Sequence, residues 1–251
     1  MYTHALNCSI AFPDLPVLER AGAAAAAGFS AVEFWWPFAS AAPSDLEVGR
    51  FAASVESAGV ELVGLNLAAG DMPAGDRGLV SWPGRAQEFR DSVAVAVGLG
   101  ERLGTRIFNA LYGNRIDGVT GQDDLADENL AHAAKEAGRI GATVVLEPLS
   151  GADRYPLRTA ADAVAVLDRV GAEHLGLLFD VYHLAVNGDD LDAAITRFAD
   201  RIAHVQLADA PGRHEPGTGD IDFPHVLDAL EKAGYTGRIA LEYVPTRKVI
   251  A

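Results

Sequence analysis

Apolar positions along the chain follow two alternating patterns, and each pair of patterns occupies roughly 30 residues. Longer runs rich in Ala, Leu, Glu and Arg have the periodicity of amphipathic helices, as in Val17–Ala27, Arg85–Leu103 and Leu125–Arg139. Between them lie short runs rich in β-branched and aromatic residues, which are typical of strands. The predicted strands are Ala5–Ile10, Ala31–Trp35, Val60–Leu67, Arg106–Leu111, Thr143–Glu147, Leu175–Asp180, Ile202–Leu207 and Arg238–Tyr243.

Eight strands with seven intervening helices predict an α/β fold, a (β/α)8 TIM barrel formed by residues 1–251 as a single domain. Several predicted helices give way to strands at a glycine, which is typical of a helix C-terminus: Gly28, Gly59, Gly104 and Gly234. The alternative is a doubly wound open sheet, but the first strand is not followed by a glycine-rich turn. Only Tyr243–Ala251 follows the last strand, so we expect a shortened or missing eighth helix.

Composition and net charge limit the partners and the cellular location that we expect for this protein. The length of 251 residues and an apolar fraction of 49% fit one large folded domain. The formal net charge of −15 argues against nucleic acid and anionic membranes as partners. Cys8 is the single cysteine, and neither a secretory signal nor an apolar run of membrane-spanning length is evident, so we expect a cytoplasmic protein.

Four oxygen-bearing side chains end four successive predicted strands: Glu147, Asp180, Gln206 and Glu242. Taken alone, each of these residues is equally consistent with a structural role, as a strand-end cap or as one partner of a salt bridge, and with a functional one. In a parallel barrel, however, the C-terminal ends of all strands open on one face, where the four side chains can converge. Three carboxylates and an amide oxygen form a hard ligand set that suits Mg²⁺ or Mn²⁺ better than zinc. The sequence therefore predicts a divalent metal site, with Glu147 and Glu242 placed to move a proton between neighbouring carbons.

Other residues near these strand ends are candidate substrate contacts. His183 follows Asp180 by three residues, and Asn66 ends the third predicted strand. The loop Arg213–Asp220 contains Glu215, and its Arg213 is suited to clamp a carboxylate; Arg77 and Arg85 are further cationic candidates. The long loop that carries these two arginines predicts a lid or a subunit contact.

These residues resemble hydroxypyruvate isomerase and its relatives among the xylose-isomerase-like sugar isomerases and epimerases. The similarity runs over nearly the whole chain. Its most specific parts are the long loop after the third strand and the Glu-Pro-Gly-Thr-Gly element at 215–219. Further shared segments are Gly28–Phe34, Asn66–Asp71, Glu147-Pro148, Asp180–His183 and His204–Asp209.

The resemblance implies a metal site of Glu147, Asp180, Gln206 and Glu242, with Glu147 and Glu242 as the acid/base pair and His183 on the substrate. The implied reaction interconverts hydroxypyruvate and tartronate semialdehyde through an enediolate. The sequence departs from the family pattern at Leu149–Ala152, where an Asn often follows Glu-Pro. The substrate contacts of that loop, and with them the exact substrate, are therefore left open.

The sequence leaves other functions open. A ketose 3-epimerase, a 2-oxo-tetronate isomerase or an inosose-dehydratase-like enzyme would keep the barrel and the metal. A DNA-repair endonuclease of the same fold would need several zinc ions, many histidines and a basic face. A non-catalytic binder of sugar acids would have no need for both glutamates.

The expected partner is a small hydroxy-oxo acid or sugar. Assembly into a homo-oligomer is a further expectation, drawn from the aromatic run Trp35–Phe38 and the short C-terminus.

Overall fold

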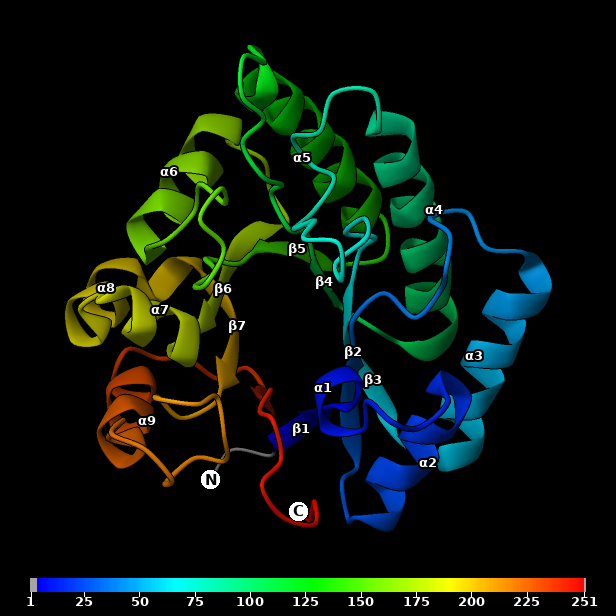
Figure 1. The fold of residues 1–251 in the computed structure, drawn as a ribbon, viewed down its shortest axis with the longest axis vertical. Helices are drawn as coiled ribbons and strands as arrows, with labels where there is room; N and C mark the ends of the chain where they lie inside the picture. The colour runs from blue at the N-terminus through cyan, green and yellow to red at the C-terminus, as the bar shows by residue number, and fades with distance from the viewer. Residues whose placement is uncertain (1–3, 251) are drawn as a thin grey trace.

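The computed structural model describes residues 4–250 and shows a closed barrel of eight parallel strands in sequence order (Figure 1). Each strand pairs with the next along the chain, and β1 closes the barrel by pairing with β8. The predicted barrel is therefore confirmed over the open sheet. The strands are β1 His4–Asn7, β2 Ala31–Phe34, β3 Glu61–Asn66, β4 Ile107–Asn109, β5 Thr143–Leu146, β6 Leu175–Asp180, β7 Ile202–Leu207 and β8 Ile239–Leu241.

Helices surround the barrel and pack on one another in chain order from α2 to α6 and from α8 to α9 (Figure 1). Two of the seven connections carry more helix than the sequence predicted, because α1 precedes α2 and both α7 and α8 lie between β6 and β7. The helices are α1 Cys8–Ala11, α2 Val17–Ala26, α3 Asp45–Ala58, α4 Ala86–Leu103, α5 Gln122–Gly138, α6 Ala160–Val170, α7 Val181–Asn187, α8 Leu191–Phe198 and α9 Phe223–Lys232.

The first predicted strand, Ala5–Ile10, was wrong beyond Asn7. The Asn7 side chain accepts a hydrogen bond from the backbone N–H of Ser9, and this N-cap turns the chain into α1. Cys8 and Ala11 are buried on that short helix. An apolar run therefore continued across the boundary between a strand and a helix, and periodicity alone cannot separate the two in so short a segment.

Local signals set most other helix boundaries. Capping boxes begin α3 at Ser44 and α6 at Thr159. Gly59 and Gly104 end α3 and α4 in the left-handed conformation, as predicted.

The interior of the barrel changes from apolar to polar along the strands. Small side chains of Ala5, Ala31 and Ala240 pack together with Val63 inside it. Two residues further along β1 and β2, and two beyond Ala240, stand Asn7, Glu33 and Glu242, all buried. Because alternate residues of a strand share a face, these polar side chains enter the barrel one layer nearer its C-terminal end.

After β8 the described chain forms no further helix through residue 250, as expected from its short C-terminus. This segment runs between α9 and α2 in the outer ring (Figure 1). Glu215 holds it by accepting hydrogen bonds from the Thr246 backbone N–H at 3.0 Å and the Thr246 hydroxyl at 2.9 Å. Among residues 4–250, no helix is both long and apolar enough to cross a membrane.

Candidate active site

The four predicted strand-end residues lie together at the C-terminal end of the barrel. Glu147 follows β5, Asp180 ends β6, Gln206 lies in β7 and Glu242 follows β8, and all four are buried. Potential ligand atoms of Glu147, Asp180, His183 and Glu242 lie within 4.8 Å of one another. The amide Nε2 of Gln206 lies 3.5 Å from Glu242 Oε1. The structure therefore brings together side chains that are up to 95 positions apart in the sequence (242 − 147 = 95).

Neighbouring strands hold one oxygen of each glutamate. Asn109 at the end of β4 donates its amide hydrogen to Glu147 Oε2 at 2.6 Å. Asn7 Nδ2 and Trp35 Nε1 both donate to Glu242 Oε1 at 2.8 Å. Sequence reasoning gave Asn7 and Asn109 no role, because the predicted strands Ala5–Ile10 and Arg106–Leu111 ran past the residues at which β1 and β4 end.

The orientation of Gln206 follows from Glu33 on β2. The Gln206 amide Nε2 donates to Glu33 Oε2 at 2.9 Å, while Glu33 Oε1 contacts His204 Nε2. The Gln206 Oε1 atom is buried and accepts no hydrogen bond from any of residues 4–250, and the same holds for Asp180 Oδ2. Because buried polar atoms are nearly always satisfied, two such oxygens in one cluster fit a cation bound between them.

Among the described residues, the buried acidic groups at this end of the barrel outnumber the arginine that contacts them. Four buried carboxylates, those of Glu33, Glu147, Asp180 and Glu242, share the barrel end with one guanidinium, that of Arg213. Burial raises the pKa of Glu147 well above its usual value, and the charges of Glu242 and Asp180 add to this effect. Burial likewise raises the pKa of Glu242 to about 7, although Arg213 opposes it. A hard divalent cation would offset this negative charge, and the donor set fits one.

His183 faces the same cluster in a defined protonation state. Its Nε2 lies 3.8 Å from both Glu147 Oε1 and Asp180 Oδ2. Burial lowers the pKa of His183 well below its usual value, and the positive charges of Arg213 and Arg77 lower it further. The backbone N–H of Ser150 donates to Nδ1 at 3.0 Å, so the single proton of the neutral ring is on Nε2. In this tautomer His183 is a hydrogen-bond donor to the cavity, which fits a substrate oxygen better than a metal ion.

Arg213 reaches the cluster from the loop after β7. Its Nη2 contacts Glu242 Oε2 and lies 3.7 Å from Asp180 Oδ2, and its guanidinium lies 5.4 Å from the ring centre of Tyr182. The backbone of Arg213 has a φ of 57°, in the left-handed region that few non-glycine residues adopt. The loop therefore holds this cation against the two carboxylates at some conformational cost.

A cavity of about 360 Å³ opens over these groups. Its wall includes the predicted substrate contacts Asn66, His183 and Arg213 together with Arg77 and Ser150. Glu215 does not belong to this wall, because its carboxylate is engaged with Thr246 in the C-terminal segment. A contact between Glu215 and substrate stays a prediction.

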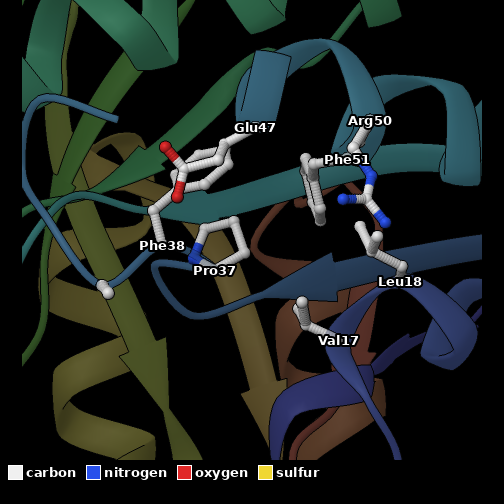
Figure 2. A pocket seen from close by; sticks show the side chains of 8 residues that line it. Val17, Leu18, Pro37, Phe38, Glu47, Arg50 and Phe51 are labelled. Atoms are coloured by element: carbon white, nitrogen blue, oxygen red, sulfur yellow. The ribbon is translucent and has the colours of Figure 1, made fainter. Parts of the chain in front are cut away.

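Two pockets lined by residues of the segment 35–38 lie outside this cavity. One of about 670 Å³ adjoins it, shares Trp35 and Asn66, and extends past Trp36 and Arg85. The other, about 150 Å³, lies between the start of α2 and α3, where Phe38 and Phe51 form its apolar wall (Figure 2). None of the four strand-end residues lines this outer pocket, so it is separate from the candidate active site.

Comparison with known proteins identifies the class. The profile of the xylose isomerase-like TIM barrel family matches residues 21–251, and the chain belongs to this family. Its fold is also similar to a Brucella melitensis structure titled AP endonuclease, family 2, with a TM-score of 0.88 and 33% identity over 99% of this chain and 95% of that one.

Named relatives show to which group within this family the chain is most similar. It is 48% identical to a Streptomyces coelicolor protein provisionally named hydroxypyruvate isomerase, over 96% of this chain and 90% of that protein. It is 33% identical to the hydroxypyruvate isomerase of Escherichia coli, over 98% and 94% of the two chains. It is also 34% identical to a 2-oxo-tetronate isomerase of Cupriavidus necator, over 96% and 92%. Within the barrel family, the chain is an enzyme of the hydroxypyruvate isomerase-like group, as the sequence motifs predicted.

Proposed function

We propose that this protein is a divalent-metal-dependent isomerase that interconverts hydroxypyruvate and tartronate semialdehyde, or a closely related small oxo-acid pair. The observation that supports it most strongly is the buried cluster of Glu147, Asp180, Gln206 and Glu242, in which two oxygens accept no hydrogen bond from residues 4–250. Glu147, Asp180, Gln206 and Glu242 would hold Mg²⁺ or Mn²⁺ through hard oxygen atoms. When bound, such an ion polarises a substrate carbonyl and the adjacent hydroxyl.

The proton transfer is assigned to Glu147 and Glu242, which both line the cavity. One carboxylate removes a proton from C3 of hydroxypyruvate, which gives an enediolate between C2 and C3. The other delivers a proton to C2, while the hydroxyl proton of C3 passes to the C2 oxygen, so that an aldehyde remains at C3. Burial raises the pKa of both carboxyl groups, that of Glu242 to about 7, and a raised pKa suits a group that accepts and returns a proton. His183 donates its Nε2–H to a substrate oxygen.

Turnover and isotope exchange test this assignment together. With Mn²⁺ or Mg²⁺ present and chelator as the reference, we expect the wild type to form tartronate semialdehyde and to exchange a C3 hydrogen of hydroxypyruvate in D₂O. Glu147→Gln and Glu242→Gln should each lower turnover by roughly 100-fold or more. The variant that lacks the C3 base should also lose the exchange, while the variant that lacks its partner should keep it.

The exposed Glu56, which pairs with Arg102 far from the cavity, offers a matched control as Glu56→Gln. Full turnover in both active-site variants would contradict the assignment. Turnover of ketoses in place of hydroxypyruvate by the wild type would move the proposal to an epimerase of the same barrel.

A second candidate function is that of an endonuclease acting on abasic DNA, because the similar Brucella melitensis structure is named AP endonuclease. Only one histidine, His183, belongs to the candidate ligand group found among residues 4–250, and the net charge of −15 opposes DNA binding. We therefore expect neither binding nor cleavage of a duplex with an abasic site, measured by anisotropy and gel assay at low salt. Metal-dependent strand cleavage would favour the endonuclease over the isomerase.

A further inference from the structure

Three arginines lie near the cavity, and their partners differ. Arg85 donates from Nε and Nη2 to both oxygens of Glu88 at 2.9 and 2.7 Å, and Nη1 lies 3.3 Å from Asp76 Oδ2. Its guanidinium also stacks 4.8 Å from the ring centre of Trp82. Arg85 is therefore engaged by Glu88 of α4 and by Asp76 and Trp82 of the preceding loop, and it does not line the catalytic cavity.

Arg213 lines the cavity, but carboxylates of the cluster already engage it. Its Nη2 contacts Glu242 Oε2 and is 3.7 Å from Asp180 Oδ2. The attraction of a guanidinium to these two groups competes with attraction to a substrate carboxylate. Arg213 is thus poorly placed to be the main anion-binding group of the cavity.

Arg77 lines the same cavity and differs from both. Within residues 4–250 it forms no ion pair with a carboxylate, and the hydrogen bonds of its side chain go from Nη1 to the backbone carbonyls of Met72 and Asp76, at 3.0 and 2.7 Å. These neutral acceptors orient the guanidinium without cancelling its charge.

The backbone around Arg77 is fixed before any substrate binds. The Arg77 carbonyl accepts a hydrogen bond from Gly113 N–H at 2.9 Å, and Gly78 N–H donates to the carbonyl of Ala69 at 2.9 Å. Gly78 has a φ of 111°, and a Cβ there would lie 1.9 Å from the Leu111 carbonyl oxygen, so only glycine fits. A cation held this firmly loses little conformational freedom on binding an anion.

We propose that Arg77 binds the carboxylate of the substrate and so selects a small oxo-acid over a neutral sugar at this site. The inference rests on the proposed function, and it names the residue that determines the substrate class. The planar guanidinium matches a carboxylate through two N–H donors, and Nε and Nη2 are available for it. Arg77 lines the same cavity as Glu147 and Glu242, so a small acid bound to Arg77 shares that cavity with the two glutamates.

Equilibrium binding tests this role without relying on turnover. The probes are glycerate and glycerol, which share a three-carbon frame and differ by the carboxylate, and calorimetry with Mn²⁺-loaded protein gives the Kd of each. We expect Arg77→Met to weaken glycerate binding roughly 10- to 100-fold, the size of a lost charge-assisted hydrogen-bonded contact, and to leave glycerol unchanged. Arg77→Lys should recover part of the loss, because it keeps the charge without the planar fork.

The matched control is Arg85→Met, in which the same substitution is made in the same loop. It should leave the ratio of the two dissociation constants unchanged. An unchanged ratio in Arg77→Met would overturn the inference, and so would an equal loss for both probes, which would point to a damaged loop. The melting temperature and Mn²⁺ affinity of each variant show whether the fold and metal site are intact.

Kinetics then separates this inference from the proposed function. With hydroxypyruvate, Arg77→Met should raise KM by a similar factor while kcat changes little, as expected when a uniform binding contact is lost. Turnover by the wild type with an unchanged KM in Arg77→Met would refute the role of Arg77 and keep the isomerase. Absence of hydroxypyruvate turnover with Arg77-dependent glycerate binding would refute the substrate and keep Arg77 as the carboxylate-binding residue.

Discussion

At the scale of single residues, the candidate site depends on how each buried polar group is oriented. Asn7, Trp35 and Asn109 each donate to one oxygen of a catalytic glutamate candidate. The other oxygen of Glu147 lies 3.8 Å from His183 Nε2, and the other oxygen of Glu242 contacts Arg213 Nη2. Removing such a supporting contact typically lowers metal affinity or activity by about 10- to 100-fold, because these contacts orient the ligands.

Glu33 offers a direct test of this orientation. Glu33→Met removes the main acceptor for Gln206 Nε2, so the Gln206 amide loses the contact that fixes its orientation. We expect a loss of Mn²⁺ affinity of roughly 10-fold or more, measured by calorimetry or electron paramagnetic resonance. Glu33→Gln retains an acceptor oxygen and should keep most of the affinity. Equal Mn²⁺ affinity in wild type and Glu33→Met would show that Glu33 does not position Gln206.

At the scale of elements, the loop after β7 is organised by one carboxylate. Asp209 is fully buried, and its two oxygens accept four backbone hydrogen bonds of 2.8–3.1 Å, from Ala210, Gly217, Gly219 and Ile221. This loop carries Arg213 into the site. Burial alone would raise the pKa of Asp209, but the four N–H groups together lower it.

We expect Asp209→Asn to lower the free energy of unfolding by about 2–3 kcal/mol, because one pair of N–H donors would face an amide NH₂ instead of an oxygen. Since the folded pKa is depressed below the ordinary 3.8, Asp209 stabilises the protein above that pH, and its contribution fades as the pH falls through the folded pKa. Urea unfolding at several pH values should show the gap between wild type and variant narrowing below pH 3.8. A gap that persists in acid would mean that the carboxylate charge is not the cause.

At the scale of the whole molecule, the four proposed ligands join β5, β6, β7 and β8, which approach one another only in the closed barrel, so a bound cation would stabilise the folded chain over the unfolded one. A ligand that binds only the folded state contributes about 2.7 kcal/mol at a concentration 100 times its Kd. For a chain of this size, we expect Mn²⁺ to raise the melting temperature by roughly 5–10 °C in differential scanning calorimetry. Chelator should reverse the rise. The double variant Glu147→Gln/Asp180→Asn should lose it, and a full shift there would place the bound ion elsewhere.

The sequence by itself determined the barrel, its strand order and the four strand-end residues Glu147, Asp180, Gln206 and Glu242. Alternating apolar runs, glycine helix ends and polar strand ends are local signals, and a parallel barrel turns them into a three-dimensional arrangement with few choices. The same signals misplaced the end of β1 at Ile10, since they cannot divide a continuous apolar run. Glu215 shows the limit as well: its motif is local, but its partner Thr246 is not.

Only the tertiary structure decided how the site residues are oriented and which cation is available to bind an anion. The donors to each glutamate come from other strands, and the proton on His183 Nε2 follows from the Ser150 backbone 33 residues away. Arg77, Arg85 and Arg213 look equivalent in the sequence, and the difference between them is whether a carboxylate is already beside the guanidinium. Electrostatic interactions depend on distance in space, so their outcome is fixed when the chain closes into a barrel and not before.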